Sequence, residues 1–160
     1  MIFDLVIDLE YDYVQDPIHC GIKLNNKSLY EGILDRNKFH FLCESTGDNT
    51  LQIHMYNKPI NGTLIDKDNS IIKDTFIKIK NIEIDKRRLK YAVVDCGCTI
   101  DNQGITQNSN FISKNGYYQI KFSTPIKTFL QDYYNKFDNY KIIDVEIEIQ
   151  QLEEMLDSLG

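Results

Sequence analysis

The sequence predicts a mainly β protein: an antiparallel β-sandwich or jelly roll with one or two short C-terminal helices. Three observations support this prediction. Several segments alternate apolar and polar residues with a period of two, clusters of turn-forming residues separate them, and a helical period appears only after residue 123. Because each such strand has one apolar face, two sheets must pack together to bury these faces.

The first half of the chain contains the clearest strands. Residues 3–11 alternate almost perfectly, and a second run between residues 18 and 24 repeats the pattern. Asn25-Asn26 then predicts a tight turn, because Asn tolerates positive φ. Two further strands are expected at 38–44 and around 51–55. The residues expected to face inward are Phe3, Leu5, Ile7, Leu9, Tyr11, Ile18, Cys20, Ile22, Leu24, Phe39, Phe41, Cys43, Leu51, Ile53 and Met55.

The middle of the chain is less regular. Residues 57–70 are rich in Asn, Pro, Gly and Asp, which predicts a long loop. The apolar parity within 71–84 changes at Lys80-Asn81, which predicts a β-bulge or a change of sheet. Residues 91–100 predict a short strand and residues 101–116 a polar surface loop. A last strand follows, with Tyr118, Ile120 and Phe122 facing inward.

The C-terminal part changes to a helical period. Ser123-Thr124-Pro125 predicts a helix start, and apolar residues recur at helical spacing up to residue 137. Asp138-Asn139 is expected to end this helix, which divides the chain into a sandwich domain (1–137) and a tail (138–160). The start of the tail can alternate as a strand. Its later apolar residues fit one helical face that packs either on its own domain or on a partner, and they are Ile149, Leu152, Met155, Leu156 and Leu159.

Charge and hydropathy exclude several function classes. The 160-residue chain has a net charge of -6 and a pI near 5.0, which disfavours binding to the phosphates of nucleic acids. The basic cluster Lys86, Arg87, Arg88 and Lys90 is expected to be a solvated turn. We expect no membrane association, because no apolar run approaches the roughly 20 residues that span a bilayer. The N-terminal residues begin a strand instead of a signal peptide, so synthesis in a cytoplasm is expected.

Residues suited to catalysis form no familiar motif. The sequence contains no nucleophile elbow, catalytic-cysteine pattern or glycine-rich phosphate loop, so no enzymatic activity is expected. Cys20 and Cys43 fall on inward strand positions and are expected to be buried thiols. Cys96 and Cys98 supply only half of a four-ligand zinc site, and no second pair is present.

Two groups of residues suggest metal binding, each with a simpler alternative. Asp66, Asp68, Ser70 and Asp74 resemble the first half of a calcium loop, but Ile77 stands where such a loop needs a bidentate Glu. The alternative is a β-turn that joins two strands. The three histidines share outward strand positions and would converge only if their strands are neighbours; otherwise they are surface residues. They are His19, His40 and His54.

The aromatic composition suggests a carbohydrate surface. The chain has ten tyrosines and no tryptophan, and an exposed ring is the usual platform for a sugar. Tyrosine is also an ordinary strand residue, so both interpretations stay open. The tyrosines that are candidates for exposure are Tyr11, Tyr13, Tyr30, Tyr56, Tyr117 and Tyr134. They motivate one hypothesis: a carbohydrate-binding module, assisted by calcium at the 57–70 loop.

Residues 54–85 and 118–130 resemble a β-sandwich domain found in uncharacterised structural proteins of tailed phages and other viruses. That domain is similar in architecture to calcium-dependent carbohydrate-binding modules. The sequence departs from it in having Asn69-Ser70 where Gly-Asn is usual and in lacking tryptophans. The resemblance covers residues 1–137 and implies a capsid decoration, neck or tail protein without catalytic residues.

Residue usage agrees with a viral source. The chain has 23 Ile, 15 Lys and 14 Asn but one Ala, a bias typical of AT-rich genomes such as those of many phages. The main prediction is therefore a non-enzymatic virion component, made in the host cytoplasm, which binds other virion proteins or further copies of itself. The alternative is the carbohydrate-binding module. No cofactor is expected apart from calcium at the turn described above.

Overall fold

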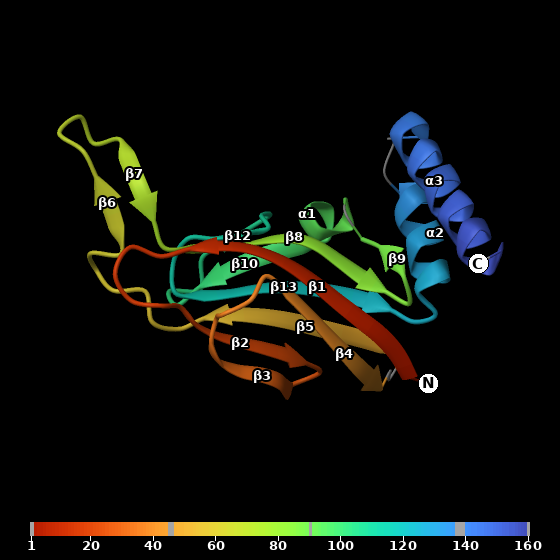
Figure 1. The fold of residues 1–160 in the computed structure, drawn as a ribbon, viewed down its shortest axis with the longest axis horizontal. Helices are drawn as coiled ribbons and strands as arrows, with labels where there is room; N and C mark the ends of the chain where they lie inside the picture. Colours follow the sequence, from red (N-terminus) through yellow and green to blue (C-terminus); the bar gives the residue numbers. More distant parts are fainter. Residues whose placement is uncertain (1, 45–46, 90, 137–139, 160) are drawn as a thin grey trace.

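Two antiparallel sheets form the body of the protein (Figure 1). The computed structural model describes residues 2–44, 47–89, 91–136 and 140–159, with the backbone alone for 140–148 and 159. In chain order the elements are β1 (Ile2–Asp12), β2 (His19–Leu24), β3 (Lys27–Ile33), β4 (Lys38–Glu44), β5 (Asp48–Met55), β6 (Thr63–Ile65), β7 (Ile71–Asp74), β8 (Phe76–Ile84), β9 (Arg87–Arg88), α1 (Ala92–Asp95), β10 (Gly97–Asp101), β11 (Thr106–Gln107), β12 (Phe111–Ile112), β13 (Gly116–Ser123), α2 (Ile126–Lys136) and α3 (Tyr140–Leu159).

The two sheets enclose one apolar core. The first sheet has the order β12-β8-β1-β4, with β9 paired to β8, and the second has the order β11-β10-β13-β5-β2-β3. Residues such as Ile7, Ile53, Ile79 and Tyr118 have no exposed surface. The predicted antiparallel β-sandwich is therefore confirmed. The hairpin β6–β7 projects from one end of the sandwich, and α2 and α3 lie at the other (Figure 1).

The strand predictions of the first half are confirmed. All the residues expected to face inward are buried except Tyr11 and Phe41, which are partly buried against the core. The turn between β2 and β3 has positive φ at Asn25 (52°) and Asn26 (66°), as a two-residue hairpin turn requires.

A β-bulge explains the change of parity in β8. Asp8 pairs with Asn81, whereas the next residue, Leu9, pairs with Ile79, so Lys80 is the extra residue. The bulge shifts the alternation by one position. Isoleucines of opposite sequence parity on either side of Lys80 can therefore all point into the core.

Four expectations for other segments need correction. The 57–70 loop contains β6, which pairs with β7. The strand expected at 91–100 is a helical turn, α1, followed by β10, and the loop at 101–116 contains the two-residue strands β11 and β12. The local sequence does not predict these short strands, because they are strands only through their pairing with β10 and β8. The start of the tail belongs to α3 and is not a strand. The predicted helix end at 138–139 lies outside the described residues.

The buried cysteines behave as predicted. Cys20 and Cys43 are buried, and all four cysteines are unpaired. Burial, with a smaller contribution from Glu31, raises the pKa of Cys20 to about 12, and burial raises that of Cys43 to about 11. Thiols with such pKa values stay protonated at neutral pH and are poor nucleophiles.

The C-terminal helix α3 contacts the basic turn at β9. Arg87 lies 3.2 Å from Glu154 and Arg88 lies 3.6 Å from Glu153, and the Gln150 amide is directed at the Arg88 carbonyl. Of the basic cluster, only Lys86 lies in a turn, whereas Arg87 and Arg88 form the strand β9 and pair with the tail, which corrects the prediction of a solvated turn. Lys90 lies outside the described residues. Among the residues that the structure describes, no helix is long and apolar enough to span a membrane.

The ion pairs between β9 and α3 predict a salt-dependent stability. Exposed pairs of this kind contribute between about 0 and 1 kcal/mol each. Replacing both Arg87 and Arg88 by Gln should therefore lower the free energy of unfolding by about 1 kcal/mol at low salt and by less in 1 M NaCl. Urea unfolding at both salt concentrations measures this difference. Equal salt dependence in the variant and the parent protein would show that the pairs contribute nothing.

Candidate ligand-binding surface

The outer face of the second sheet carries a continuous group of aromatic rings. The strands β2, β5 and β13 are neighbours, and His54 pairs with both Gly21 and Tyr117. The His54 ring lies 5.3 Å from Tyr56 and 4.9 Å from Tyr117, centroid to centroid, and Tyr56 lies 5.6 Å from His19. We call these four rings, from His19, His54, Tyr56 and Tyr117, the ring cluster.

Gly21 makes room for the ring of Tyr56. A Cβ atom on Gly21 would lie 2.7 Å from the Tyr56 hydroxyl oxygen and 2.9 Å from its Cε2. Real Cβ atoms do not approach other atoms so closely, so the edge of the phenol occupies space that a side chain at position 21 would fill. The glycine in β2 therefore leaves the space that Tyr56 occupies beside His54.

Polar side chains flank the rings and are hydrogen-bonded to each other. The Gln52 amide donates to the Gln119 Oε1 at 2.9 Å, and the Gln52 Oε1 lies 3.0 Å from the His54 Nε2. At the other side, the His19 Nε2 lies 3.1 Å from a Glu31 carboxylate oxygen. Because these residues lie on paired strands, the sheet holds donors and acceptors in fixed positions beside the rings.

The His54 and Tyr56 rings of the cluster are neutral near pH 7. Burial lowers the pKa of His54, and the nearby Lys23 lowers it further, although Glu31 opposes them. Burial and then Glu31 and Cys20 raise the pKa of the Tyr56 phenol. The surface thus combines a neutral imidazole and a protonated phenol with the charged groups of Glu31 and Lys23.

The structure gathers only some of the predicted aromatic residues. Of the candidate tyrosines, Tyr56 and Tyr117 belong to the ring cluster. The others, Tyr11, Tyr13, Tyr30 and Tyr134, pack against the core. Two of the three histidines, His19 and His54, belong to the ring cluster, and the ring of each contacts that of Tyr56.

The third histidine, His40, lies on the first sheet, 3.0 Å from Asp4. The partners Gln52, Gln119 and Glu31 were not predicted. Gln52 and His54 occupy alternate, outward positions of β5, and Tyr117 and Gln119 do so in β13. This alternation is the sequence pattern that could have identified the two glutamines.

The residues predicted to bind calcium lie at two ends of the β6–β7 hairpin. At the tip, the Asp66 Oδ1 accepts hydrogen bonds from the Asp68 and Ser70 amides and closes a turn. At the base, the Asp74 Oδ1 lies 2.6 Å from the Lys58 Nζ. Across the ranges that the structure describes, no group of three or more His, Cys, Asp or Glu is placed to hold a metal ion.

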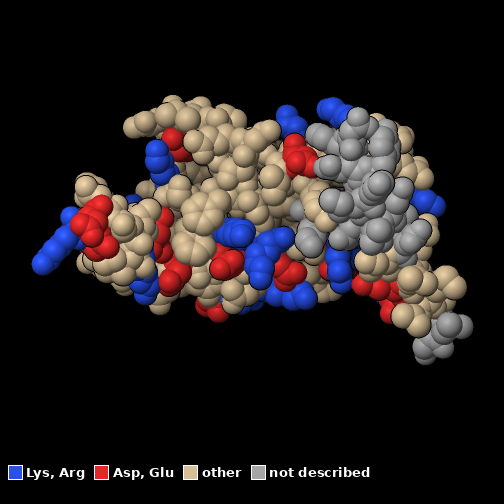
Figure 2. Space-filling view, turned by 90° about the horizontal axis from the view of Figure 1, so that it is seen from above, with Lys and Arg blue, Asp and Glu red and all other residues tan. Residues whose placement is uncertain are grey.

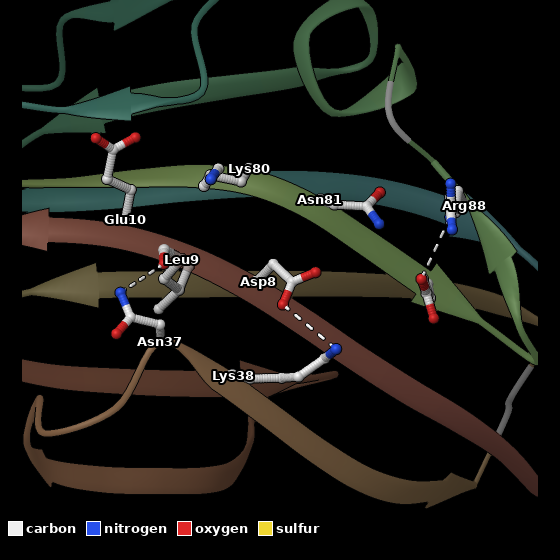
Figure 3. Close-up of a pocket in the computed structure, with 9 residues that line it drawn as sticks. Asp8, Leu9, Glu10, Asn37, Lys38, Lys80, Asn81 and Arg88 are labelled. Atoms are coloured by element: carbon white, nitrogen blue, oxygen red, sulfur yellow. Dashed lines mark hydrogen bonds and ion pairs between the residues drawn. The ribbon is translucent and has the colours of Figure 1, made fainter.

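A depression on the outer face of the first sheet is a second candidate for the binding surface (Figure 3). It has a volume of about 800 Å³ and is lined by charged and amide side chains from β1, β4, β8 and β9, together with Leu9 and with Asn37, which precedes β4. Asp8 lies 3.9 Å from Lys38, and Glu83 lies 3.6 Å from Arg88, so much of its charge is paired. It has no aromatic lining residue, and we regard the ring cluster as the better candidate.

Charges are also mixed on a further face of the molecule. Viewed from above, Asp and Glu alternate with Lys and Arg over the described part of this face (Figure 2). Such an arrangement lacks the broad positive region that binding to a phosphate backbone needs.

Comparisons with known proteins find matches among solved structures alone. No protein-family model and no curated protein matches the sequence. A structure of vCBM60 in complex with galactobiose is similar, with a TM-score of 0.48 and 11% identity, covering 75% of this chain and 97% of that one.

A selenomethionine structure of vCBM60, described with two circularly permuted families of calcium-dependent carbohydrate-binding modules, has a TM-score of 0.49 and 9% identity. It covers 74% of this chain and 89% of that one. The chain has a β-sandwich fold. The resemblance to phage and virus structural proteins has no counterpart among these matches.

Proposed function

We propose that the protein is a non-catalytic glycan-binding module and that the ring cluster is its binding surface. The observation that carries this proposal is the group of four adjoining rings, flanked by hydrogen-bonding amides, on three paired strands and on Tyr56, which directly follows β5. Aromatic rings contact the apolar C–H groups of a sugar, and neighbouring polar groups bind its hydroxyls. A sheet that is packed on its inner face presents both without large rearrangement.

The polar groups of this surface suit binding more than hydrolysis. Most glycoside hydrolases need two carboxyl groups on either side of the scissile bond. The surface as defined here contributes one carboxylate, Glu31, which is paired with His19. The amides of Gln52 and Gln119 donate and accept hydrogen bonds but do not transfer protons.

Binding is proposed to be independent of calcium. Asp66 is used by the turn at the hairpin tip, and the ammonium group of Lys58 already neutralises Asp74. A glycan array probed with the protein in 5 mM CaCl₂ and again in EDTA tests both parts of the proposal. Binding that persists in EDTA is expected; binding to no glycan in either buffer would reject the proposed function.

A matched pair of histidine variants locates the surface. His19 and His40 each lie beside a carboxylate, at 3.1 Å and 3.0 Å, but on opposite sheets. His19→Ala should weaken the affinity for a bound glycan about threefold to tenfold, because it removes one ring of the cluster. His40→Ala should leave the affinity unchanged. Calorimetric titration of both variants measures this, and equal effects would place the binding surface elsewhere.

A second candidate function, assembly as a virion component, is favoured by the exposed apolar side of α3. Ile149, Leu152, Met155 and Leu156 are between 42% and 68% exposed, although the helix is held to β9 by ion pairs. The side chain of Leu159 lies outside the described residues. Exposed apolar groups of this kind commonly mark protein–protein contacts.

The assembly hypothesis predicts self-association or incorporation into particles through α3. Replacing Leu152 and Leu156 by Glu should abolish any concentration-dependent increase in mass measured by light scattering. The matched control replaces the exposed residues Leu64 and Ile72 of the β6–β7 hairpin by Glu and should not change it. A parent protein that stays monomeric and enters no particle would count against this candidate.

A further inference from the structure

A small pocket lies next to the ring cluster and shares one residue with it. It is formed where β10 and β11 approach β12 and the start of β13, and Tyr117 is among its lining residues. Its volume is about 110 Å³, well below the roughly 300–1,000 Å³ of pockets that enclose whole small molecules. This volume suits one substituent of a larger ligand.

Apolar and aromatic residues form half of the pocket's lining, and Thr99, Asp101, Gln107, Ser113 and Lys114 form the other half. Ile100, Ile105, Phe111 and Ile112 line it together with Tyr117. Ile105 and Phe111 are 53% and 38% exposed. Apolar area that is open to water favours a ligand group that brings its own apolar surface, such as a methyl group.

Two charged side chains add a donor and an acceptor. Lys114 contributes an ammonium group, and Asp101 contributes a carboxylate. The Asp101 Oδ1 accepts hydrogen bonds from the backbone amides of Gln103 and Ile105, at 2.9 Å and 3.0 Å, which fixes the position of this carboxylate. The pocket therefore offers a hydrogen-bond donor, an acceptor and apolar walls within one small volume.

We propose that this pocket binds the acetamido group of an N-acetylated sugar residue in the glycan. The inference rests on the proposed function and names the sugar chemistry that it selects. An acetamido group combines a methyl group, a carbonyl acceptor and an N–H donor, which complement the apolar walls, Lys114 and Asp101 respectively. A plain hexose has no methyl group to cover the isoleucines.

Two-dimensional NMR of the ¹⁵N-labelled full chain tests this pocket with defined probes. N-acetylglucosamine and glucose are each titrated to the same millimolar concentration. N-acetylglucosamine should shift the amide signals of Ile100, Ile105 and Phe111, and glucose should not. Equal shifts with both sugars, or shifts with neither, would overturn the inference.

Matched variants separate a failure of this inference from a failure of the proposed function. Ile105→Asp places a charge in the pocket but keeps the backbone hydrogen bonds that Ile105 makes with Asp101. Its control is Ile72→Asp, a change at another exposed isoleucine, on the β6–β7 hairpin. Ile105→Asp should weaken binding of an N-acetylated oligosaccharide at least fivefold, and Ile72→Asp should not.

The outcomes have distinct meanings. Tighter binding of N-acetylated glycans than of their non-acetylated counterparts, lost in Ile105→Asp alone, supports the inference. Glycan binding that depends on the ring cluster but shows no preference for acetylation overturns the inference and leaves the proposed function standing. The absence of binding to every glycan on the array overturns both.

Discussion

Replacing Lys58 by Met is expected to lower the free energy of unfolding by about 3 kcal/mol. The Lys58 ammonium donates to the Asp74 carboxylate and to the Ser113 carbonyl, both at 2.6 Å. Only 12% of the Lys58 side chain and 16% of the Asp74 side chain are exposed. Removing one partner leaves the other charge buried without compensation, which typically costs about 3–5 kcal/mol; partial access of water to this site places the expected loss at the lower end.

Lys73→Met is the matched control for this prediction. Lys73 lies 3.7 Å from Asp12, and about half of each side chain is exposed. An exposed pair of this kind contributes between about 0 and 1 kcal/mol. Urea unfolding of the two variants should therefore differ clearly. If both lost the same stability, Lys58 would not hold the base of the β6–β7 hairpin to the sandwich.

The same site predicts a loss of stability in acid. Burial by itself would raise the pKa of Asp74, but hydrogen bonds from Lys58, Thr63 and the Thr75 amide, with the Lys58 charge, lower it overall. A carboxyl group whose pKa is lower in the folded state stabilises the protein above its unfolded pKa of about 4, and this contribution disappears as the pH falls through the folded pKa.

Asp74→Asn measures the acid-sensitive contribution. The difference in unfolding free energy between the parent protein and this variant should be largest near pH 6 and should shrink below pH 4. Chemical denaturation at several pH values gives the difference directly. A difference that stays constant down to pH 2 would contradict the lowered pKa.

The second large effect is expected on glycan binding. Replacing both Tyr56 and Tyr117 by Ala should weaken affinity about thirtyfold, or about 2 kcal/mol, because each ring contributes about 0.5–1.5 kcal/mol beyond its buried area. Replacing both by Phe keeps the rings and should retain most of the affinity. Isothermal titration with the glycan that binds most tightly on the array measures both variants.

Gly21→Ala probes the arrangement of the rings without removing any of them. Its Cβ would meet the edge of the Tyr56 ring and the Glu31 carboxylate, so Tyr56 must leave its present position beside His54. Affinity should fall while the unfolding temperature changes little, because the displaced ring lies at the surface. Unchanged affinity would show that binding does not need Tyr56 beside His54.

Local sequence patterns predicted the parts of the fold that depend on the order of neighbouring residues. The alternation in β1 places Phe3, Leu5 and Ile7 in the core, and the change of parity in β8 marks a bulge at Lys80. The strands β11 and β12 have two residues each and depend on pairing with distant segments. No local pattern identifies such strands.

The candidate site shows the same division between local and non-local causes. The outward positions of His19 and His54 were predicted, but their proximity depends on the pairing of β2 with β5, which sequence alternation does not specify. The acidic turn at Asp66 was interpreted as metal-binding or as a β-turn. The hydrogen bonds from the Asp68 and Ser70 amides show that its carboxylate closes the turn.

Mapping the glycan contact by NMR tests the central claim most directly. The ¹⁵N-labelled protein is titrated with the tightest-binding glycan of the array, and changes in amide chemical shift are placed on the structure. We predict that the largest changes fall on β2, β5 and β13, around Gly21, Gln52, His54, Tyr117 and Gln119. Changes confined to the β6–β7 hairpin or to α3, with none on these three strands, would contradict the account.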